Sequence, residues 1–294
     1  MNTEPVVEEW SGAQPLDSRF VISDKEFRVL RDLIHAHTGI ALADHKRALV
    51  CARLARRLRH LGLSNYTEYY ELLAERDRDG YELMEMVNAI TTNKTDFLRE
   101  PHHFKFLTDH VFPALQTSHN RRLRIWSAAC SSGEEAYSIA INVCESLPLA
   151  DYDVKILASD IDTNMIERAV RGEYPLQSLE NIPEDLRTKY FLRGTRANEG
   201  QARVKPLLQS FVRFRRLNLI DEAWPMQGPF DVIFCRNVFI YFDKELQRRL
   251  LNRFAAMLRP GGYLMLGHAE AVHGFEALFR TVGHSIYENR GDTA

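Results

Sequence analysis

The stretch from residue 124 to residue 135 constrains the fold of this chain more than any other. It starts with the apolar run Ile125-Trp126, passes through small residues to Gly133, and meets a helical pattern at once. A strand that leads through a tight turn into a helix is the repeating unit of α/β proteins. The turn of such a unit presents backbone N–H groups and side chains to a ligand at the carboxyl edge of the sheet. We therefore expect a binding site beside this turn.

Strand and helix patterns alternate through the rest of the C-terminal two thirds of the chain. We expect strands at 122–129, 154–159, 230–235, 263–266 and 285–289, and helices at 133–146, 163–171 and 243–258. Because apolar strands alternate with helices, the sheet should be mostly parallel and covered on both faces. Residues 173–216 break this rhythm around a hairpin-like turn, so we expect a small antiparallel β insertion there.

The first hundred residues follow a different pattern. Residues 1–20 mix Pro, Glu, Ser and Gly without periodicity, which is typical of a disordered leader. Residues 21–90 predict a small all-helical domain, with a capping box at Ser23 and Glu26 and further helices at 44–61, 64–75 and 80–90. The polar residues 91–100 then form a linker, and residues 101–294 form the α/β domain.

The bulk composition excludes several classes of protein. With 294 residues and a formal net charge of −2, the chain is not expected to bind nucleic acid over its whole surface. The four cysteines are scattered and form no C-x-x-C pair, so they are expected to be buried thiols in a reducing compartment. No apolar run approaches the length of a membrane span, and the acidic N-terminus is unlike a signal peptide. These features predict a cytoplasmic protein.

A second strand end supplies a carboxylate where a ribose would lie. The strand at 154–159 ends on Asp160, while Asp162 is better placed to cap the next helix. An acidic residue at this edge is the expected partner of ribose hydroxyls, so Asp160 indicates an adenosine-containing cofactor. Only Gly133 stands where a dinucleotide fingerprint has three glycines, which disfavours a pyrophosphate. S-adenosylmethionine fits, because it carries a ribose and an adenine but no phosphate.

Other strand ends carry weaker signals. Glu135 either faces the ligand or merely completes a capping box at the helix start, and its position alone favours neither. Asn218 has the donor and acceptor that an adenine edge requires, although Asn is also common in turns. Arg236 and Asn237 follow an apolar strand directly, and an arginine among apolar residues needs a partner.

The histidines do not predict a metal site. His35 and His37 are two residues apart and so do not share a helix face. The pair His102-His103 lacks a cysteine or an acidic cluster at ligand spacing. We therefore expect no bound metal.

Taken together, these segments resemble the chemotaxis receptor methyltransferases, the CheR type of protein-glutamate O-methyltransferase. The resemblance runs from about Val21 to Asn289 and rests on ordered blocks that include Leu42-Ala43-Asp44-His45-Lys46-Arg47, Thr92-Asn93-Lys94-Thr95-Asp96-Phe97-Leu98-Arg99-Glu100, Ala158-Ser159-Asp160-Ile161-Asp162 and Phe234-Cys235-Arg236-Asn237-Val238. It implies an all-helical N-terminal domain joined to a Rossmann-like domain that binds S-adenosylmethionine. It also implies a cofactor site lined by Asn93, Thr95, Arg99, Glu135, Asp160, Asn218, Leu219, Arg236 and Asn237.

The resemblance further implies the reaction. The methyl group of S-adenosylmethionine would pass to glutamate side chains of chemoreceptors, giving methyl esters for sensory adaptation and S-adenosylhomocysteine as the product. A glutamate is already ionised at neutral pH, so no general base is required and catalysis should come from proximity and alignment. Our hypotheses are that Arg99 holds the incoming carboxylate and that Tyr241 shapes the methyl-transfer site.

Two regions are candidates for binding the receptor. The helix at 44–61 has an apolar stripe at Leu54, Leu58 and Leu61, and its remaining surface carries Arg53, Arg56, Arg57 and Arg59. Such a run is usually a solvated face, but its density favours electrostatic docking to an acidic helical bundle, with RNA as the competing ligand. The insertion resembles the family's β-subdomain, which in some members adds a peptide from the receptor's C-terminal end as an extra strand. Arg193, Gly194 and Gly200 match that subgroup, although they also suit an ordinary hairpin turn.

Two other functions compete with this interpretation. An RNA methyltransferase would use the basic helix to hold phosphates, but the composition supplies no extended basic surface. A silent S-adenosylmethionine sensor would require loss of Arg99 or Tyr241, and both are present. The resemblance instead implies a cytoplasmic protein that is recruited to receptor clusters at the inner face of the membrane, without binding nucleic acid or inserting into the bilayer.

Overall fold

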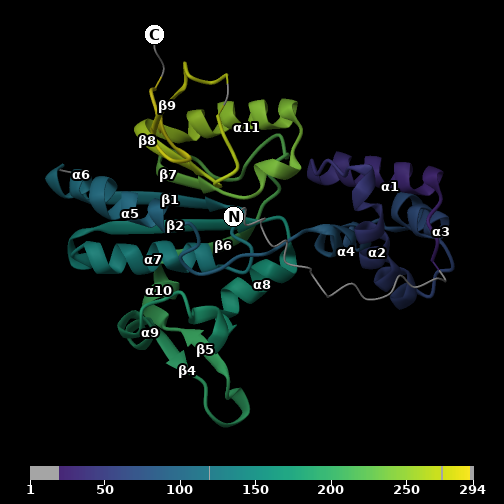
Figure 1. Ribbon diagram of the computed structural model, residues 1–294, viewed down its shortest axis with the longest axis horizontal. Helices are drawn as coiled ribbons and strands as arrows, with labels where there is room; N and C mark the ends of the chain where they lie inside the picture. The colour runs from purple at the N-terminus through teal and green to yellow at the C-terminus, as the bar shows by residue number, and fades with distance from the viewer. Residues whose placement is uncertain (1–19, 119, 273, 292–294) are drawn as a thin grey trace, which may run out of the picture. The chain divides into compact units, whose positions relative to one another are not determined.

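The computed structural model describes residues 20–118, 120–272 and 274–291, which divide into two compact units (Figure 1). The smaller unit comprises the described residues up to Ala36 together with Leu42–Ile90, and the larger comprises His37–Ala41 and the described residues from Thr91 onward. The leader expected at residues 1–20 lies almost wholly outside the described residues.

The smaller unit is all-helical, as expected. Its helices are α1 (Asp24–Thr38), α2 (Arg47–Leu61, after a 3-10 turn), α3 (Tyr66–Glu71, extended by a π turn to Arg76) and α4 (Tyr81–Ile90). The capping box at the start of α1 is confirmed, because the Ser23 N–H donates to Glu26 at 2.9 Å and the Glu26 N–H donates to Ser23 at 3.2 Å. In α2 the stripe residues Leu54 and Leu58 are fully buried, whereas Leu61 is only half-buried.

The larger unit is built on a seven-stranded sheet with the order β6-β2-β1-β7-β8-β10-β9. The strands are β1 (Arg122–Ala128), β2 (Asp153–Asp160), β6 (Val212–Arg216), β7 (Phe230–Cys235), β8 (Leu258–Leu266), β9 (Phe279–Gly283) and β10 (Ile286–Asn289). The first five in this order are parallel, and β10 pairs antiparallel with both β8 and β9. The predicted α/β sheet is therefore confirmed. Its edge strand β9 was not predicted, and its other edge strand, β6, lies within residues 173–216, which were expected to form the antiparallel insertion.

Side chains from the two faces of this sheet form two separate cores. Along β1, Ile125 belongs to the core under α5 (Pro101–Phe106), α6 (Phe112–Thr117) and α7 (Glu134–Ser146). Its neighbour Trp126 belongs to the opposite core, under α11 (Lys244–Met257). The alternation follows from the pleat, which points successive side chains to opposite faces. Both faces are thus covered by helices, as Figure 1 shows.

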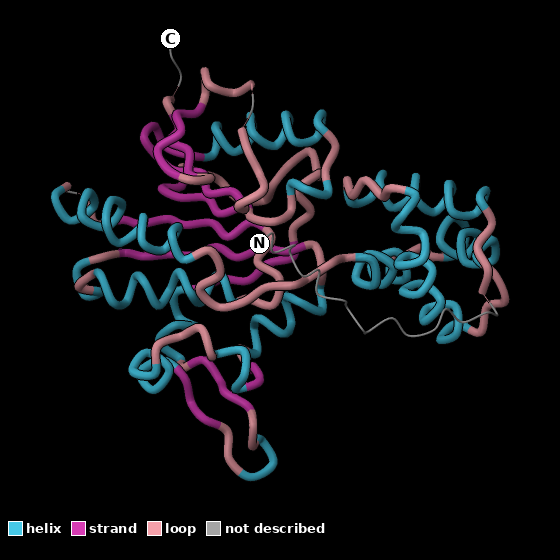
Figure 2. Tube along the Cα trace, in the orientation of Figure 1, coloured by secondary structure: helices cyan, strands magenta, loops and turns pink. Residues whose placement is uncertain are grey.

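The insertion forms a second, three-stranded antiparallel sheet with the order β3-β5-β4. Its strands are β3 (Glu173–Pro175), β4 (Phe191–Arg193) and β5 (Gln201–Val204), flanked by α8 (Thr163–Arg171), α9 (Glu184–Tyr190) and α10 (Pro206–Phe211). In Figure 2 the β4–β5 hairpin extends away from the main sheet. The antiparallel insertion is therefore confirmed, and β4 is one of its edge strands. Among the described residues, no helix is both long and apolar enough to span a membrane.

Candidate functional site

The turn after β1 is shaped by residues in the left-handed region of backbone space. Ala129, Ser131 and Gly133 have φ angles of 93°, 48° and 98°. A Cβ on Gly133 would lie 2.8 Å from the Cβ of Ala169, so only glycine fits at this position. The N–H groups of Ala129 and Cys130 both donate to the Ser159 carbonyl, at 2.8 and 2.9 Å. These bonds fix the turn against the end of β2, where Asp160 lies.

Asp160 is buried beside this turn at the carboxyl edge of the sheet. Its Oδ2 accepts a hydrogen bond from the Ser131 N–H at 2.8 Å, and its Oδ1 accepts one from the Asp162 N–H at 3.0 Å. Each carboxylate oxygen has two lone pairs, so capacity remains for a ligand. Burial raises the pKa of Asp160 to about 6, although the backbone donors oppose this shift. The Asp160 carboxyl group is thus ionised at neutral pH and can accept hydrogen bonds from hydroxyl groups.

Asp162 has the capping role assigned to it and a second role that the sequence did not reveal. Its Oδ1 accepts from the Asn164 and Met165 N–H groups at the start of α8. Its Oδ2 accepts from the side chains of Thr91 and Asn93, both at 2.7 Å. One carboxylate therefore joins the linker to the end of β2.

The linker packs against the larger unit and is not a freely exposed connection. The Asn93 carbonyl accepts from the Ser131 hydroxyl at 2.9 Å, and the Leu98 N–H donates to the Ser138 hydroxyl at 2.9 Å. Phe97 is fully buried and meets Tyr174 edge to face at 5.0 Å. Thr95 is half-buried within the same segment. The backbone from Asn93 to Arg99 is thus held beside the turn after β1.

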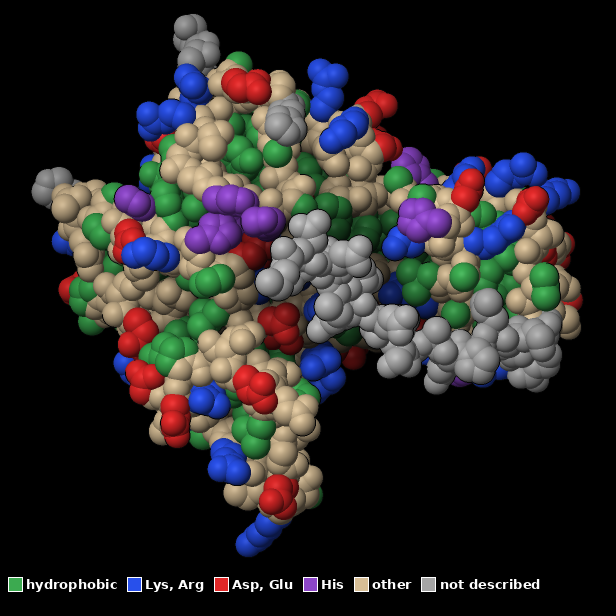
Figure 3. Space-filling view, in the orientation of Figure 1, with side chains coloured by type: hydrophobic (Ala, Val, Ile, Leu, Met, Phe, Trp, Pro, Cys, Tyr) green, Lys and Arg blue, Asp and Glu red, His purple; other side chains and the backbone are tan. Residues whose placement is uncertain are grey.

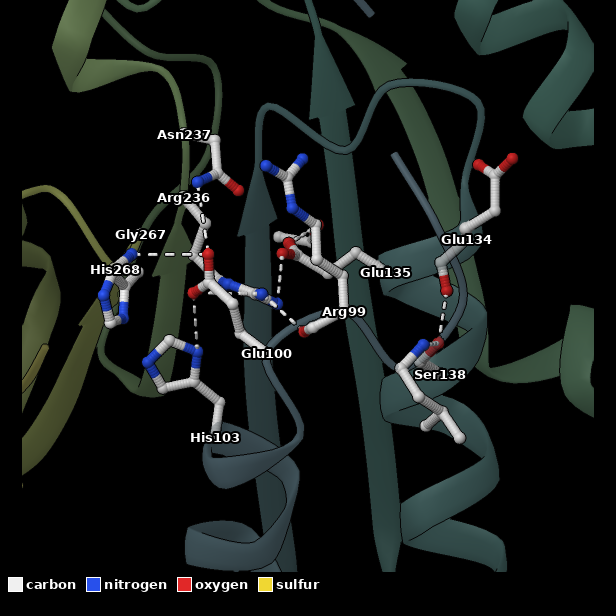
Figure 4. Close-up of polar contacts among 12 residues, drawn as sticks. Arg99, Glu100, His103, Glu134, Glu135, Ser138, Arg236, Asn237, Gly267 and His268 are labelled. Carbon is white, nitrogen blue, oxygen red and sulfur yellow. Dashed lines mark hydrogen bonds and ion pairs between the residues drawn. The ribbon is translucent and has the colours of Figure 1, made fainter. Parts of the chain in front are cut away.

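Arg236 is at the centre of a buried charge network (Figure 4). Its side chain is 2% exposed and lies 3.1 Å from a Glu135 oxygen and 3.2 Å from a Glu100 oxygen. It also donates to the Arg99 carbonyl at 2.5 Å. The partner that this arginine required is therefore present, and it consists of two carboxylates and a linker carbonyl. Arg236 connects the end of β7 to both the linker and α7.

The two carboxylates respond differently to this environment. Burial raises the pKa of Glu135, and the nearby Arg236 offsets that effect only in part. Burial also acts on Glu100, but there Arg236 and Asn237 outweigh it and the pKa lies below its usual value. Glu135 also accepts from the Ser127 hydroxyl at 2.6 Å. The capping-box alternative for Glu135 is wrong, because α7 begins at Glu134 and Glu135 bonds to side chains of the sheet.

Asn237 and Tyr241 lie on the loop that follows β7. Asn237 has a left-handed φ of 58°, and its amide donates to Glu100 at 3.2 Å. Tyr241 ends a short 3-10 turn and is half-buried, and its carbonyl accepts from the Ala41 N–H at 2.8 Å. The loop thus places both predicted site residues on the edge that carries Arg236.

Asn218 and Leu219 follow the end of β6, the strand beside β2. The Asn218 amide donates to the His37 carbonyl at 2.8 Å, and its oxygen accepts from the Ile220 N–H at 3.3 Å. Leu219 is buried in the core under α11. The hydrogen bonds of Asn218 explain its position structurally, and its pairing with adenine stays a prediction.

Comparison with known proteins identifies the architecture. The SAM-binding domain of CheR methyltransferases matches residues 93–287, and the all-alpha domain of the same proteins matches residues 25–91. The chain belongs to the CheR methyltransferase family. It is 47% identical to chemotaxis protein methyltransferase 2 of Pseudomonas aeruginosa over 92% of this chain and 95% of that protein. It is 43% identical to the chemotaxis protein methyltransferase of Escherichia coli, over 92% of this chain and 93% of that protein.

Membership of the CheR family makes the chain a methyltransferase that uses S-adenosylmethionine. The residues at the sheet edge fit that cofactor. Asp160 is a buried carboxylate of the kind that can accept hydrogen bonds from ribose hydroxyls, and the turn after β1 lacks the additional glycines that a pyrophosphate needs. Glu135, at the first turn of α7, provides negative charge at the same edge. Asn93, Arg99 and Arg236 are joined to these carboxylates directly or through one intermediate residue, and Asn237 is joined to Glu135 through Glu100 and Arg236.

Glu100 and Glu270 were not predicted from the sequence. Glu100 touches Arg236, Asn237 and the N–H of His268, and so connects three segments of the larger unit. Glu270 accepts from the backbone of the loop after β7. The helix over residues 101–117 was also missed, because Pro101 and Pro113 obscure its pattern.

The reason given against a metal at His102-His103 is wrong. Ligand atoms of Glu100, His102 and His103 lie within 4.8 Å of one another. Histidine side chains also gather on the face of the molecule that Figure 3 shows. However, the Glu100 oxygen that lies 3.6 Å from His103 is also 3.2 Å from the Arg236 guanidinium. A metal cation bound there would face that positive charge, so we assign no metal to the group. Burial lowers the pKa of His103 to about 3 and keeps its ring neutral.

The basic helix α2 is less free than its sequence indicates. Arg57 is 16% exposed and pairs with Glu82 and Glu85 of α4. Arg53 donates to the Ile90 carbonyl, and Arg59 donates to the Ala55 carbonyl within its own helix. Arg57, which was expected to contribute to the docking surface, is therefore occupied by ion pairs within the small unit. Arg56 and Arg59 are exposed.

Proposed function

We propose that this methyltransferase transfers the methyl group of S-adenosylmethionine to glutamate side chains of chemoreceptors, giving methyl esters used in sensory adaptation. The observation that carries the proposal is that the linker, residues 91–100, is hydrogen-bonded to residues at the carboxyl edge of the sheet, where the cofactor would bind. Arg236 donates to the Arg99 carbonyl, and Asp162 accepts from the Asn93 side chain, so the linker is held at both of these residues. The side chain of Arg99 is half-exposed, and its charge acts on the buried Glu135 carboxylate. A positive group at that position suits an anionic methyl acceptor.

The chemistry asks little of the protein beyond binding and alignment. Bound S-adenosylmethionine supplies a methyl group on a positively charged sulfur. The acceptor glutamate is ionised at neutral pH, so no side chain of this chain has to remove a proton. Alignment of two bound groups can contribute about 7–11 kcal/mol to catalysis when the geometry is good. Asp160 and Glu135 bind the cofactor. Arg99 and Tyr241 lie at the same carboxyl edge of the sheet, so the bound cofactor lies beside them.

Arg99 and Tyr241 have separate roles in the proposed reaction. The Arg99 guanidinium donates to the Lys94 carbonyl at 2.9 Å and keeps further N–H groups for the acceptor carboxylate. The Tyr241 hydroxyl shapes the space in which the methyl group moves. Arg99→Ala should therefore lower turnover more than cofactor affinity. An equal loss of both would remove this role.

Receptor docking involves both the small unit and the insertion. Arg56 and Arg59 present positive charge on α2, which favours an acidic helical bundle and predicts weaker docking as salt rises. In the insertion, β4 has an open edge to which a receptor peptide can add as a strand. Gly194 is needed there, since a Cβ would lie 2.0 Å from the Asn198 carbonyl oxygen, and Gly200 has a φ of 81°. Docking of this kind would recruit the protein to receptor clusters at the cytoplasmic membrane.

The proposed reaction is tested by the stability of its product. A chemoreceptor cytoplasmic fragment is incubated with the protein and S-adenosylmethionine carrying a radioactive methyl group, and then treated with mild alkali. A carboxyl methyl ester releases the label as volatile methanol, which is the expected result. Alkali-stable label on the receptor would indicate N-methylation. Label in added RNA, with none in the receptor, would support an RNA methyltransferase.

A further inference from the structure

Glu270 is a buried carboxylate that the proposed reaction does not use directly. It lies four residues beyond the end of β8 and is 6% exposed. Its Oε2 accepts from the Gly267 N–H at 2.6 Å and from the Asn237 N–H at 2.9 Å, while its Oε1 accepts from the Ile240 N–H at 3.3 Å. Backbone donors from two separate loops thus converge on one side chain.

The loop held in this way carries the proposed methyl-transfer site. It begins at Asn237, whose φ of 58° lies in the left-handed region, which non-glycine residues seldom adopt although asparagine does so more often than most, and it ends at Tyr241. Backbone in such a conformation persists when its surroundings impose it. Two of its N–H groups, at Asn237 and Ile240, donate to the same carboxylate. The loop can therefore leave this conformation only by giving up hydrogen bonds to a buried carboxylate.

The two loops are closely packed at Gly267. A Cβ on Gly267 would lie 2.5 Å from the side-chain Nδ2 of Asn237 and 2.7 Å from the Glu270 carboxylate. The two loops approach so closely only because residue 267 has no side chain. Burial raises the pKa of Glu270, and the hydrogen bonds from Gly267, Asn237 and Ile240 oppose that rise.

We infer that Glu270 is a positioning residue, which fixes the loop from Asn237 to Tyr241 in the conformation that methyl transfer requires. The inference rests on the proposed role of Tyr241 and adds a residue that acts through it. Hydrogen bonds to a charged acceptor are stronger than those to a neutral one. Glu270→Gln keeps the size of the side chain but removes that charge and introduces an NH₂ group that faces backbone donors. The loop should then lose its fixed conformation while the sheet remains intact.

The loop itself is measured first, by amide hydrogen exchange in the full-length protein without receptor. In Glu270→Gln the amides of Asn237 and Ile240 should exchange at least about tenfold faster than in the wild type, whereas amides of β1 should be unchanged. Glu276→Gln removes an exposed carboxylate from the same segment and should leave both sets unchanged. Wild-type exchange rates in Glu270→Gln would overturn the inference. If that variant does not fold, Glu270→Asp, which retracts the carboxylate by one methylene, is measured in the same way.

Kinetics then separate positioning from a purely structural role. Misplacement of a reacting group by about 1 Å can cost on the order of a hundredfold in rate. We expect kcat of Glu270→Gln to fall by about tenfold to a hundredfold, with KM for the receptor fragment within about twofold of the wild type. Because Glu270 acts through Tyr241, the double variant with Tyr241→Phe should lose no more than the worse single variant. Losses that multiply would overturn the inference. Failure of the proposed function is seen separately, as wild-type protein that methylates no receptor.

Discussion

Replacement of Arg236 by Met should strongly destabilise the larger unit. The Arg236 side chain is 2% exposed, and its two carboxylate partners, Glu100 and Glu135, are only 14% and 12% exposed. Removing one partner of a buried ion pair leaves an uncompensated charge and costs about 3–5 kcal/mol. Here a single cation serves two carboxylates, so we expect a loss of about 4–5 kcal/mol in the free energy of unfolding at pH 8.

The loss should become smaller as the pH falls. Without Arg236 the pKa of Glu100 rises from its lowered value in the folded state, and the pKa of Glu135, which burial already raises, rises further above that of the unfolded chain. The folded protein then binds protons more tightly than the unfolded chain, so stability increases as these groups are protonated. Glu135→Gln in the Arg236→Met background should likewise restore at least about 1 kcal/mol, because it removes one of the uncompensated charges.

The assay is urea unfolding followed by tryptophan fluorescence. The ring centroids of Trp126 and Trp224 lie 5.0 Å apart in the core under α11, so these two tryptophans report the larger unit. Trp10, which lies outside the described residues, is replaced by Phe in every protein that is compared. Arg280→Met is the matched control, because that arginine is 61% exposed and pairs with Glu288 on the surface. It should cost less than about 1 kcal/mol. An Arg236→Met variant that loses no more than this control, at either pH, would refute the argument.

Three further outcomes are expected. Arg57→Ala should destabilise the small unit by about 3 kcal/mol, because it removes the ion-pair partner of the buried Glu82. Arg56→Ala should change the stability of that unit by less than about 0.5 kcal/mol. Both variants are measured by urea unfolding followed by circular dichroism. Since the pKa of Asp160 is raised to about 6 and its ionised form accepts the ribose hydroxyls, the affinity for S-adenosylmethionine should be about tenfold lower at pH 5 than at pH 7 by calorimetry, and a pH-independent affinity would contradict this role. Tyr241→Phe should reduce methyl transfer more than cofactor affinity, and a normal rate would remove the residue from the mechanism.

Local sequence patterns were sufficient to predict the strands and helix starts at the carboxyl edge of the sheet, where the candidate site lies. Asp162 was recognised as a helix cap, and Asp160 as a strand-end acid, because both roles depend on neighbours within three residues. The parallel sheet followed from apolar strands alternating with helices. Strand β8 begins at Leu258, earlier than predicted, because Pro260 and two glycines interrupt its apolar pattern.

The long-range contacts that support the site could not be predicted from local sequence patterns. Glu100 meets Asn237 across 137 residues of sequence, and Glu270 meets Asn237 across 33. Neither glutamate has a periodicity or spacing that distinguishes it from a solvated residue. The expectation for the basic helix failed for the same reason, because the acidic partner of Arg57 is Glu82, which lies 25 residues later in the sequence and on another helix. Charge compensation of this kind depends on tertiary packing.

The most direct test of the account is to locate the transferred methyl group. A chemoreceptor cytoplasmic fragment is incubated with the full-length protein and S-adenosylmethionine, and its peptides are then sequenced by tandem mass spectrometry. The account predicts a single added methyl group on glutamate side chains, present with the wild-type protein and greatly reduced with Arg99→Ala. A methyl group found only on lysine, arginine or another acceptor would contradict the proposed reaction.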